Sequence, residues 1–146
     1  MAGASAGIQI DLDDAELRAG LKQLAARIGD LTPFFRDVGE DLLNSTRERF
    51  GTQTSPAGVP WEALSPAYRK RKRKNRDKIL TLDGSLRGTL TYAIAPNELR
   101  IGSPLIYGAT HQFGRPEAGI PARPFLGLSD ADREAILDAL RDWLAR

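Results

Sequence analysis

The sequence contains no cysteine, and it has one histidine and one methionine among its 146 residues. The absence of cysteine excludes disulfides, thiolate nucleophiles and cysteine-ligated metals. Charged residues interrupt every apolar run well short of the roughly 20 residues that a membrane-spanning helix needs. The N-terminus also lacks the basic and then apolar pattern of a signal peptide. We therefore expect a soluble protein that is made in the cytoplasm and has no membrane contact.

Residues that enzymes use for chemistry are sparse in this chain. The single histidine, His111, is followed by Gln112 and Phe113, which supply neither a nucleophile nor further metal ligands. We interpret His111 as a structural residue whose imidazole hydrogen-bonds a backbone group. Gly84 and Gly88 do not form a phosphate-binding loop, and there is no G-x-S-x-G nucleophile motif. The sequence predicts neither catalysis nor a bound cofactor or metal.

Pairs of acidic residues occur three times, at Asp13–Asp14, Glu40–Asp41 and Asp130–Asp132. The first and third pairs lie at the expected starts of helices, where carboxylates accept hydrogen bonds from free amides and complement the helix dipole. The second pair falls on the polar side of an expected helix. Capping and solvation account for all three pairs without a carboxylate site.

Basic charge is concentrated in one segment, 69–78, which has eight basic residues and one acidic residue. Its net charge of +7, against +2 for the whole chain, leaves the other residues at −5. The basic residues are Arg69, Lys70, Arg71, Lys72, Arg73, Lys74, Arg76 and Lys78. Such a run can be an exposed, solvated loop, a contact for an acidic protein surface, or a contact for DNA phosphates. No aromatic residue follows Tyr68 within the run, so stacking on bases is not expected.

The first part of the chain predicts a strand and two amphipathic helices. Residues 1–7 are small and indicate a flexible terminus, whereas apolar residues alternate with polar ones over Ile8–Leu12, as in a half-buried strand. The helices have apolar positions at intervals of three and four: Leu17, Leu21, Leu24 and Ile28 in the first, and Phe34 or Phe35, Val38, Leu42, Thr46 and Phe50 in the second.

Capping residues suggest where these helices begin and end. Asp13 or Asp14 is suited to begin the first helix, and Gly29 to end it. Thr32, followed by a proline, is expected to cap the second helix. Gly51 is expected to stop it.

The second part of the chain predicts two further helices and a hairpin. Ser65–Pro66 is suited to begin a short helix that carries the basic run, and a turn is expected around Leu86. Residues 89–95 and 98–102 alternate in polarity around a turn at Pro96–Asn97, which predicts a β-hairpin. Ser129 and Asp130 are expected to cap a last helix. Its apolar face consists of Ile136, Leu137, Leu140, Trp143 and Leu144.

This order of elements favours an α+β fold, because helices and strands are grouped rather than strictly alternating. We expect a single small domain over residues 8–146. Its sheet is mixed or antiparallel and is packed by two to three helices. The chain has no internal repeat and no linker that would divide it.

The segment 101–128 is rich in residues that fix backbone shape. Prolines restrict φ and remove amide donors, whereas glycines permit conformations that are closed to other residues. These residues are Pro104, Pro116, Pro121 and Pro124, with Gly108, Gly114, Gly119 and Gly127. Large apolar side chains lie between them. The composition favours a docking or packing device over an active site.

The same segment resembles the phage virion morphogenesis, or tail-completion, family of tailed bacteriophages. The matching pieces are Ile101–Ser103, Tyr107–Ala109, His111–Gly114 and Ile120–Ser129, together with Ser55–Gly58 followed by Trp61, and Leu80–Leu86. With the C-terminal helix, the resemblance covers roughly residues 30 to 145. The order and spacing of these pieces are more specific than any one of them.

The resemblance implies a structural virion protein with a fold like that of tail terminators. Such a subunit forms a ring, of six-fold symmetry in tail proteins, at the head-proximal end of the tail. The ring ends polymerisation of the tail tube and provides the face that joins the head. The expected partners are copies of the same chain, the tail tube protein and a head–tail connector or stopper protein. DNA that passes through the particle is a further contact for the basic run.

Assembly is then expected in the host cytoplasm, and the final location is the tail or neck of the virion. Two alternatives remain. One is a head-side neck or stopper protein, and the other is a non-specific DNA-binding protein that uses the basic run.

A closed ring requires two different complementary surfaces on each subunit. Aromatic residues are enriched at such contacts, so Trp61, Tyr107, Phe113 and Phe125 belong either to the core or to an interface. We expect Phe125 at the interface, because it lies between Pro124 and Leu126 on a rigid arm. The candidate interface residues are Tyr107, Phe113, Ile120, Arg123, Phe125 and Leu126.

Overall fold

The structure of the protein is a computed structural model that describes residues 14–81, 84–96, 98–105 and 107–146. The predicted terminus 1–7 and the predicted strand Ile8–Leu12 lie outside these ranges. The elements in chain order are α1 (Ala15–Ile28), α2 (Thr32–Thr52), α3 (Pro66–Arg71), α4 (Ser85–Gly88), β1 (Thr91–Ala95), β2 (Glu98–Gly102), α5 (Tyr107–Phe113), the 3₁₀ helix η2 (Pro116–Ala118) and α6 (Asp130–Leu144).

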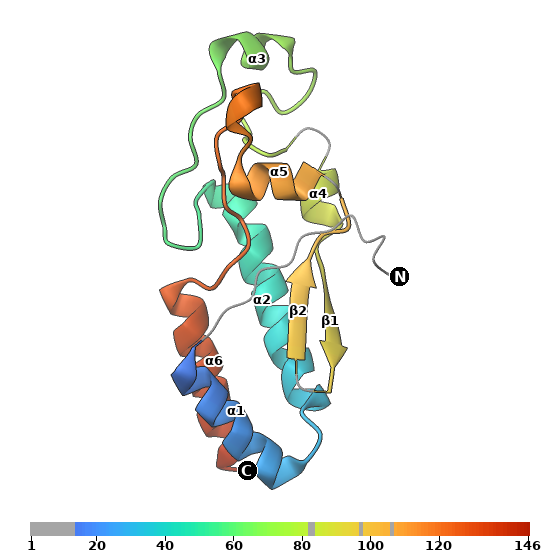
Figure 1. Cartoon of the computed structure of the whole chain (residues 1–146), viewed down its shortest axis with the longest axis vertical. Coiled ribbons are helices and arrows are strands. Elements are labelled where there is room, and N and C mark those ends of the chain that lie inside the picture. The colour runs from blue at the N-terminus through green and yellow to red at the C-terminus, as the bar shows by residue number, and fades with distance from the viewer. Residues whose placement is uncertain (1–13, 82–83, 97, 106) are drawn as a thin grey trace.

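The molecule is elongated, and α2 runs through it as a central rod (Figure 1). Helices α1 and α6 lie together at one end, and α3, α4 and α5 lie at the other. The hairpin of β1 and β2 packs along α2. Its strands are antiparallel, with Ile94 opposite Leu99 and Tyr92 opposite Ile101. The expected α+β fold with an antiparallel sheet is confirmed.

Helix α1 begins and ends as the sequence predicts. Asp14 Oδ1 accepts hydrogen bonds from the amides of Glu16 and Leu17, both at 3.1 Å. Gly29 follows the helix with φ of 77°, which is the left-handed region that favours glycine. Arg133 of α6 donates from Nε to Asp14 Oδ2 at 2.6 Å, and this bond holds the pKa of the Asp14 carboxyl below its usual value. The cap therefore also ties α1 to α6.

Helix α2 differs from its predicted ends. Thr32 is its first residue rather than its cap, because Leu31 occupies the N-cap position without a side-chain hydrogen bond. Asp30 Oδ1 accepts from Thr32 N at 3.0 Å. Gly51 lies inside the helix, which continues to Thr52. Gln53 ends the helix with φ of 57°. Its left-handed backbone is held by tertiary hydrogen bonds, in which Gln53 accepts the amides of Trp61 and Ile79. A contact distant in sequence thus overrides the local glycine signal.

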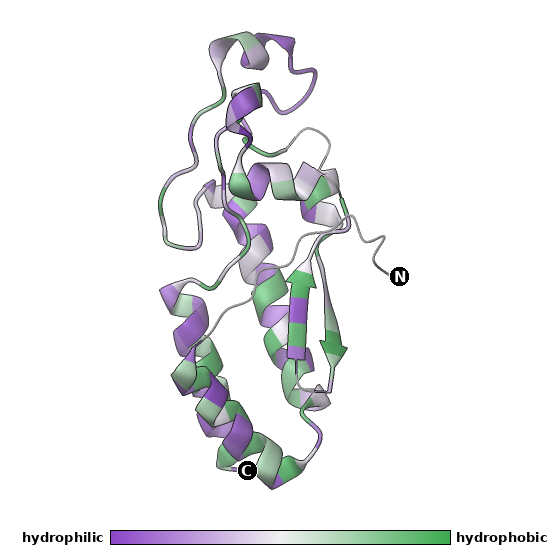
Figure 2. Cartoon of the chain, in the orientation of Figure 1, coloured by the Kyte–Doolittle hydropathy of each residue, from purple (hydrophilic) through white to green (hydrophobic). Residues whose placement is uncertain are grey.

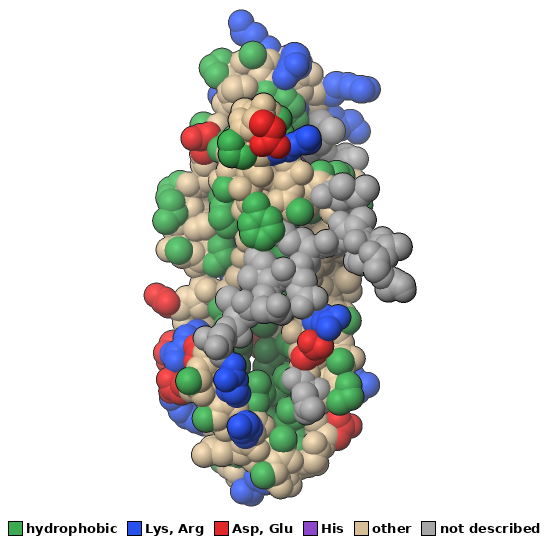
Figure 3. Space-filling view, viewed as in Figure 1, with side chains coloured by type: hydrophobic (Ala, Val, Ile, Leu, Met, Phe, Trp, Pro, Cys, Tyr) green, Lys and Arg blue, Asp and Glu red, His purple; other side chains and the backbone are tan. Residues whose placement is uncertain are grey.

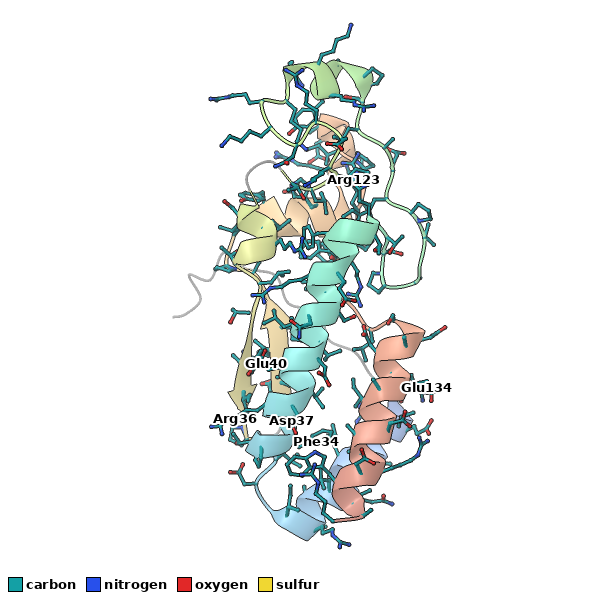
Figure 4. The ribbon with its side chains drawn as sticks, turned by 180° about the vertical axis from the view of Figure 1, so that it is seen from behind. Phe34, Arg36, Asp37, Glu40, Arg123 and Glu134 are labelled. Atoms are coloured by element: carbon teal, nitrogen blue, oxygen red, sulfur yellow. The ribbon has the colours of Figure 1, made fainter. Side chains whose placement is uncertain are left out.

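The hairpin approaches α2 closely at one glycine. A Cβ on Gly39 would lie 2.8 Å from the Tyr92 ring, so only glycine permits this contact. Tyr92 also donates its hydroxyl to Glu40 Oε1 at 3.0 Å. Figure 4 shows Glu40 on the hairpin side of α2 and Phe34 on the side that faces α6. The same helix is therefore covered from two directions.

Two hydrophobic clusters form the interior. The first, which we call the helical core, joins α1, α2 and α6 and consists of Leu24, Leu31, Phe34, Phe35, Val38, Leu137 and Leu140. The second, the aromatic core, lies at the other end of α2 and consists of Leu43, Phe50, Trp61, Ile79, Leu86, Leu90, Phe125 and Leu126. Figure 2 shows hydrophobic residues concentrated where α1, α2 and α6 approach one another.

Helix α6 begins with the predicted cap. Ser129 Oγ accepts from Asp132 N at 2.9 Å, and Asp132 Oδ2 accepts from Ser129 N at 3.0 Å, which forms a capping box. Asp130 is the first helical residue rather than part of the cap. None of the helices over the described ranges is both long and apolar enough to cross a membrane.

Candidate assembly surface

The segment 101–128 begins with the last two residues of β2, and from residue 107 on it forms helix α5, the short helix η2 and an extended arm over 120–128. The arm forms no regular sheet, so its backbone groups need other partners. Gln112 of α5 supplies them, because its Oε1 accepts from the amides of Phe125 at 2.9 Å and Leu126 at 3.0 Å. Its Nε2 donates to Leu126 O at 3.0 Å. One buried amide side chain therefore supplies the backbone hydrogen bonds that a neighbouring strand would otherwise make.

A buried ion pair holds the arm to both long helices. Arg49 of α2 donates from Nη1 to Phe125 O at 2.7 Å and from Nη2 to Asp132 Oδ2 at 2.6 Å. Ser45 Oγ donates to the other oxygen of Asp132 at 2.6 Å. Burial lowers the pKa of the Arg49 guanidinium, and the charge of Asp132 opposes that shift. Both members of the ion pair have further hydrogen-bond partners, so the pair joins α2, the arm and α6.

The sequence interpretation missed this pair. Asp132 was expected only to cap a helix and complement its dipole, and Arg49 was not singled out. A signal was present, because Arg49 lies between Thr46 and Phe50 on the apolar side of the second predicted helix. A charged residue at a buried position of a helix requires a partner.

Phe125 lies in the interior, with none of its surface exposed. Its ring packs against Phe50 at a centroid distance of 5.7 Å, and Phe50 packs against Trp61 at 5.6 Å. Trp61 Nε1 donates to Pro124 O at 2.7 Å. Leu126 is buried in the same cluster. The expected surface position is therefore wrong for Phe125 and Leu126, because the arm folds back over α2.

Arg123 is also buried, again in contrast to its expected surface position (Figure 4). Its guanidinium donates from Nε to Glu62 O at 2.7 Å and from Nη2 to Ala63 O at 3.0 Å. Burial lowers its pKa, and the charge of Glu62 opposes that shift. Arg123 thus fixes the loop after Trp61 to the arm.

The described residues provide no partner for one of the two imidazole nitrogens of His111. Its backbone carbonyl accepts from Arg123 N at 2.7 Å, but its buried Nδ1 has no partner among the described residues. Burial lowers the pKa of His111, and the positive charge of Arg123 lowers it further. Both effects favour the neutral form of the imidazole.

The remaining interface candidates stay accessible. We call Tyr107, Phe113 and Ile120 the α5 surface. Phe113 is 64% exposed and Tyr107 is 44% exposed, whereas Ile120 is half-buried. Gly114 positions this surface with φ of 76°, and a Cβ there would lie 2.7 Å from Ala122 N. Only glycine allows α5 to end against the arm in this way.

The basic run forms the second accessible region, which we call the basic tip. Seven of its cations are exposed: Arg69, Lys70, Arg71, Arg73, Lys74, Arg76 and Lys78. Figure 3 shows Lys and Arg side chains gathered at this end of the molecule. Helix α3, capped by Ser65 as predicted, carries only the first part of the run.

Lys72 departs from the expected exposed loop, because only 4% of its surface is accessible. Its Nζ donates to Asn75 O at 2.7 Å and also to Lys78 O. Arg76 Nε donates to Lys72 O at 2.7 Å. Burial lowers the pKa of Lys72, and the charge of Asp77 opposes that shift. Lys72 therefore stabilises the conformation of the loop on which the other basic residues are exposed.

Over the described ranges, no cluster of three or more acidic or histidine side chains is placed to hold a metal ion. The buried polar side chains at this end of the molecule instead hydrogen-bond to the backbone of the arm and of the loops. These bonds hold the α5 surface and the basic tip in place. This arrangement is consistent with the class that the sequence predicts, a structural assembly protein.

The comparisons with known proteins agree with this class. The sequence matches the phage virion morphogenesis family over residues 12–145, and the chain belongs to that family. It is 40% identical to "Putative capsid assembly protein G" of Escherichia phage Mu, over 88% of this chain and 92% of that protein. It is 26% identical to the Mu-like prophage FluMu G protein 2 of Haemophilus influenzae, over 93% of this chain and 95% of that protein. No solved structure matches this chain.

Membership of this family gives the chain a role in phage virion structure and assembly, and it confirms the family predicted from the motifs of residues 101–128.

Proposed function

We propose that the chain is a tail-completion subunit that forms a closed ring at the head-proximal end of a phage tail. The ring covers the last tier of the tail tube, ends its polymerisation and offers its other face to the head connector. Six-fold symmetry is part of this proposal and follows from the resemblance to tail proteins. The partners are copies of this chain, the tail tube protein and a connector or stopper protein.

The exposure of Phe113 is the observation that carries this proposal. Phe113 is 64% exposed, and its apolar ring gains no stabilisation from contact with water. A partner surface that buried the ring would gain from the hydrophobic effect. The neighbouring Gln112 is buried and hydrogen-bonded to the arm, so the backbone that carries the Phe113 ring is held in place. Preorganised aromatic groups are typical anchors of protein interfaces, because little entropy is lost when they bind.

Imaging of the particle tests the proposal most directly. Cryo-electron microscopy of the parent virion neck is expected to show this chain as a ring on the tail side, with the α5 surface in a subunit contact. A variant with Phe113→Asp is expected to fold normally but to fail in completing tails. Glu117→Ala, an exposed change on the adjacent helix η2, serves as the control. Normal tails from the Phe113→Asp variant would contradict the role of the α5 surface.

A head-side neck or stopper protein is the alternative within the same class. The same images separate the two positions, because a stopper would stay on DNA-filled heads that lack tails. A tail terminator would instead stay on tails that lack heads.

Contact with DNA is a second candidate function, and the order of the basic tip favours it. Lys72 fixes the loop from inside, so the seven exposed cations form a structured group rather than a diffuse tail. Such a group would bind phosphates without sequence preference, and the affinity would fall steeply with salt. Titration of random duplex at several salt concentrations tests this function. A flat salt response or no binding would leave docking to an acidic protein surface as the role of the tip.

A further inference from the structure

Two surfaces of opposite charge form no ion pairs within the described part of the chain. On one of them, the basic tip, seven cations are exposed, and none of the seven takes part in the ion pairs among the described residues. The buried Lys72 fixes the loop that carries them, so the positive charge is held in one place. An ordered group of exposed like charges is suited to an acidic partner.

The second surface is a row of carboxylates along α2, which we call the acidic stripe. Asp37, Asp41 and Glu48 are exposed, and with Asn44 they follow one another at intervals of four, three and four residues, which places them on one face of the helix. The row is about 16 Å long at the rise of an α-helix. No ion pair among the described residues involves these carboxylates, and the residues outside the described ranges contain no lysine or arginine. The charge of the stripe is therefore available to a cation from outside the chain.

The tip and the stripe of one molecule lie apart. The stripe faces away from the buried side of α2, between the hairpin and α6 (Figure 4), whereas the tip projects beyond the end of α2 (Figure 1). Both ends of the segment that carries the tip are fixed, because Arg123 donates to the carbonyls of Glu62 and Ala63 and Gln53 accepts from the amide of Ile79. The tip is therefore directed away from its own stripe and toward other molecules.

We propose that the basic tip of one copy docks on the acidic stripe of the next copy around the proposed ring. This inference rests on the ring and adds a charged contact to the apolar one assigned to the α5 surface. The tip and the stripe are different surfaces on different parts of the molecule, as a head-to-tail interface that closes into a ring requires. Their complementary charge fixes the register of the two copies and speeds their encounter.

The charge of the rest of the chain favours a second copy over DNA as the partner of the tip. Outside the segment 69–78 the residues sum to −5, which attracts the tip of another copy and repels a polyanion. Tyr68, beside the basic run, has the Arg71 guanidinium 5.8 Å from its ring centroid, so one face of that ring is not free to stack on a base. Each copy also brings one tip and one stripe, so a closed ring pairs all of them.

Matched charge reversals test the contact in full-length chains that are supplied to a phage lacking this protein. Arg73→Glu with Lys74→Glu reverses the tip, and Asp37→Lys with Asp41→Lys reverses the stripe. Each pair alone is expected to lower the number of joined heads and tails in electron micrographs by about tenfold or more, because like charges then face each other. All four changes together are expected to restore that number to within about twofold, since the attraction returns with its signs exchanged.

A control reverses two exposed cations elsewhere, with Lys22→Glu and Arg87→Glu, and is expected to leave the number of joined particles unchanged. All variants are expected to keep the natural unfolding midpoint, because every changed residue is exposed. No recovery in the fourfold variant would overturn the proposal. Full activity of the stripe variant beside a loss in the tip variant would also overturn it and would assign the tip to DNA.

Imaging of the virion neck separates this inference from the proposed function. A ring in the natural particle, combined with no recovery in the fourfold variant, would remove only the contact between tip and stripe. Absence of a ring would remove the proposed function and this contact with it.

Discussion

The two ends of α2 are both covered by hydrophobic clusters, but the segments that form these clusters differ. At the end covered by α1 and α6, regular helices bury leucine and phenylalanine, and nearly all backbone bonds lie within the helices. At the other end, Phe50, Trp61 and Phe125 come from segments far apart in sequence, and two of these segments are irregular. There the backbone depends on side chains such as Gln112 and Arg49 for its hydrogen bonds.

This difference coincides with the division between scaffold and exposed surface. Both the α5 surface and the basic tip belong to the end that contains the aromatic core. Irregular segments can present side chains in positions that a helix or strand does not offer, but they need braces to hold one conformation. The buried polar network supplies those braces.

The largest effect is expected in the aromatic core. Phe125→Ala leaves a cavity beside Phe50 and is expected to destabilise the chain by roughly 3–5 kcal/mol. Phe113→Ala on the α5 surface is the matched control, and its effect on stability is expected to lie within about 0.5 kcal/mol. Urea unfolding of both variants measures the contrast. Similar stabilities for the two would mean that Phe125 is not part of the core.

Loss of the ion pair between Arg49 and Asp132 is expected to destabilise the chain nearly as much. Arg49→Ala leaves Asp132 as a buried, unpaired carboxylate and removes the donor to Phe125 O, at a cost of about 3–5 kcal/mol. The exposed neighbour Glu48→Ala serves as the control. Replacing both partners, with Arg49→Met and Asp132→Leu, is expected to recover part of the loss, because no charge then remains buried. The recovery is incomplete because Phe125 O and Ser129 N lose their hydrogen-bond partners. Thermal unfolding checks this order, and a double variant no better than the single one would contradict it.

A smaller effect is expected within the basic tip itself. Lys72→Ser removes the hydrogen bonds that fold the loop and is expected to cost about 1–2 kcal/mol. A variant with Arg71, Arg73 and Lys74 changed to Ser is expected to stay within about 0.5 kcal/mol of the natural chain. Unfolding curves and limited digestion by a protease that does not cut at basic residues compare the two. A larger loss in the triple variant would show that those cations also pack within the chain.

The smallest effect concerns His111 and depends on pH. Its pKa is lowered in the folded chain, so between that value and about 6.5 the unfolded chain binds more protons. Stability is therefore expected to fall as pH drops below about 6.5, and His111→Phe is expected to reduce this loss. Unfolding at several pH values, with the natural chain and the variant side by side, isolates the contribution. Parallel pH curves for the two proteins would show that His111 is not held neutral.

Local signals were sufficient for helices α1, α2, α3 and α6 and for the hairpin, but they did not predict helix α5. The spacing of Leu17, Leu21 and Leu24 predicted α1, and the turn at residues 96 and 97 predicted the hairpin. Ser129 was correctly identified as the cap of α6. Such features depend on neighbours within a few residues, which any single sequence displays.

The candidate site was only partly predictable, because burial depends on partners that are distant in sequence. The motifs of residues 101–128 identified the segment that matters and the family. They did not show which side of the arm faces inward, so Phe125, Leu126 and Arg123 were expected at the surface and are buried. Likewise, a run of eight cations gives no indication that Lys72 turns inward.

The sequence by itself determined α1, α2, α3 and α6, the hairpin and the family, since each follows from periodicity, capping or ordered motifs along the chain. Only the tertiary structure decided the extent of α2, the ion pair of Arg49 and the division of aromatic residues between core and surface. The physical reason is the same in each case. The free energy of a buried polar or aromatic side chain is set by the groups that surround it, and those groups come together only when the chain has folded.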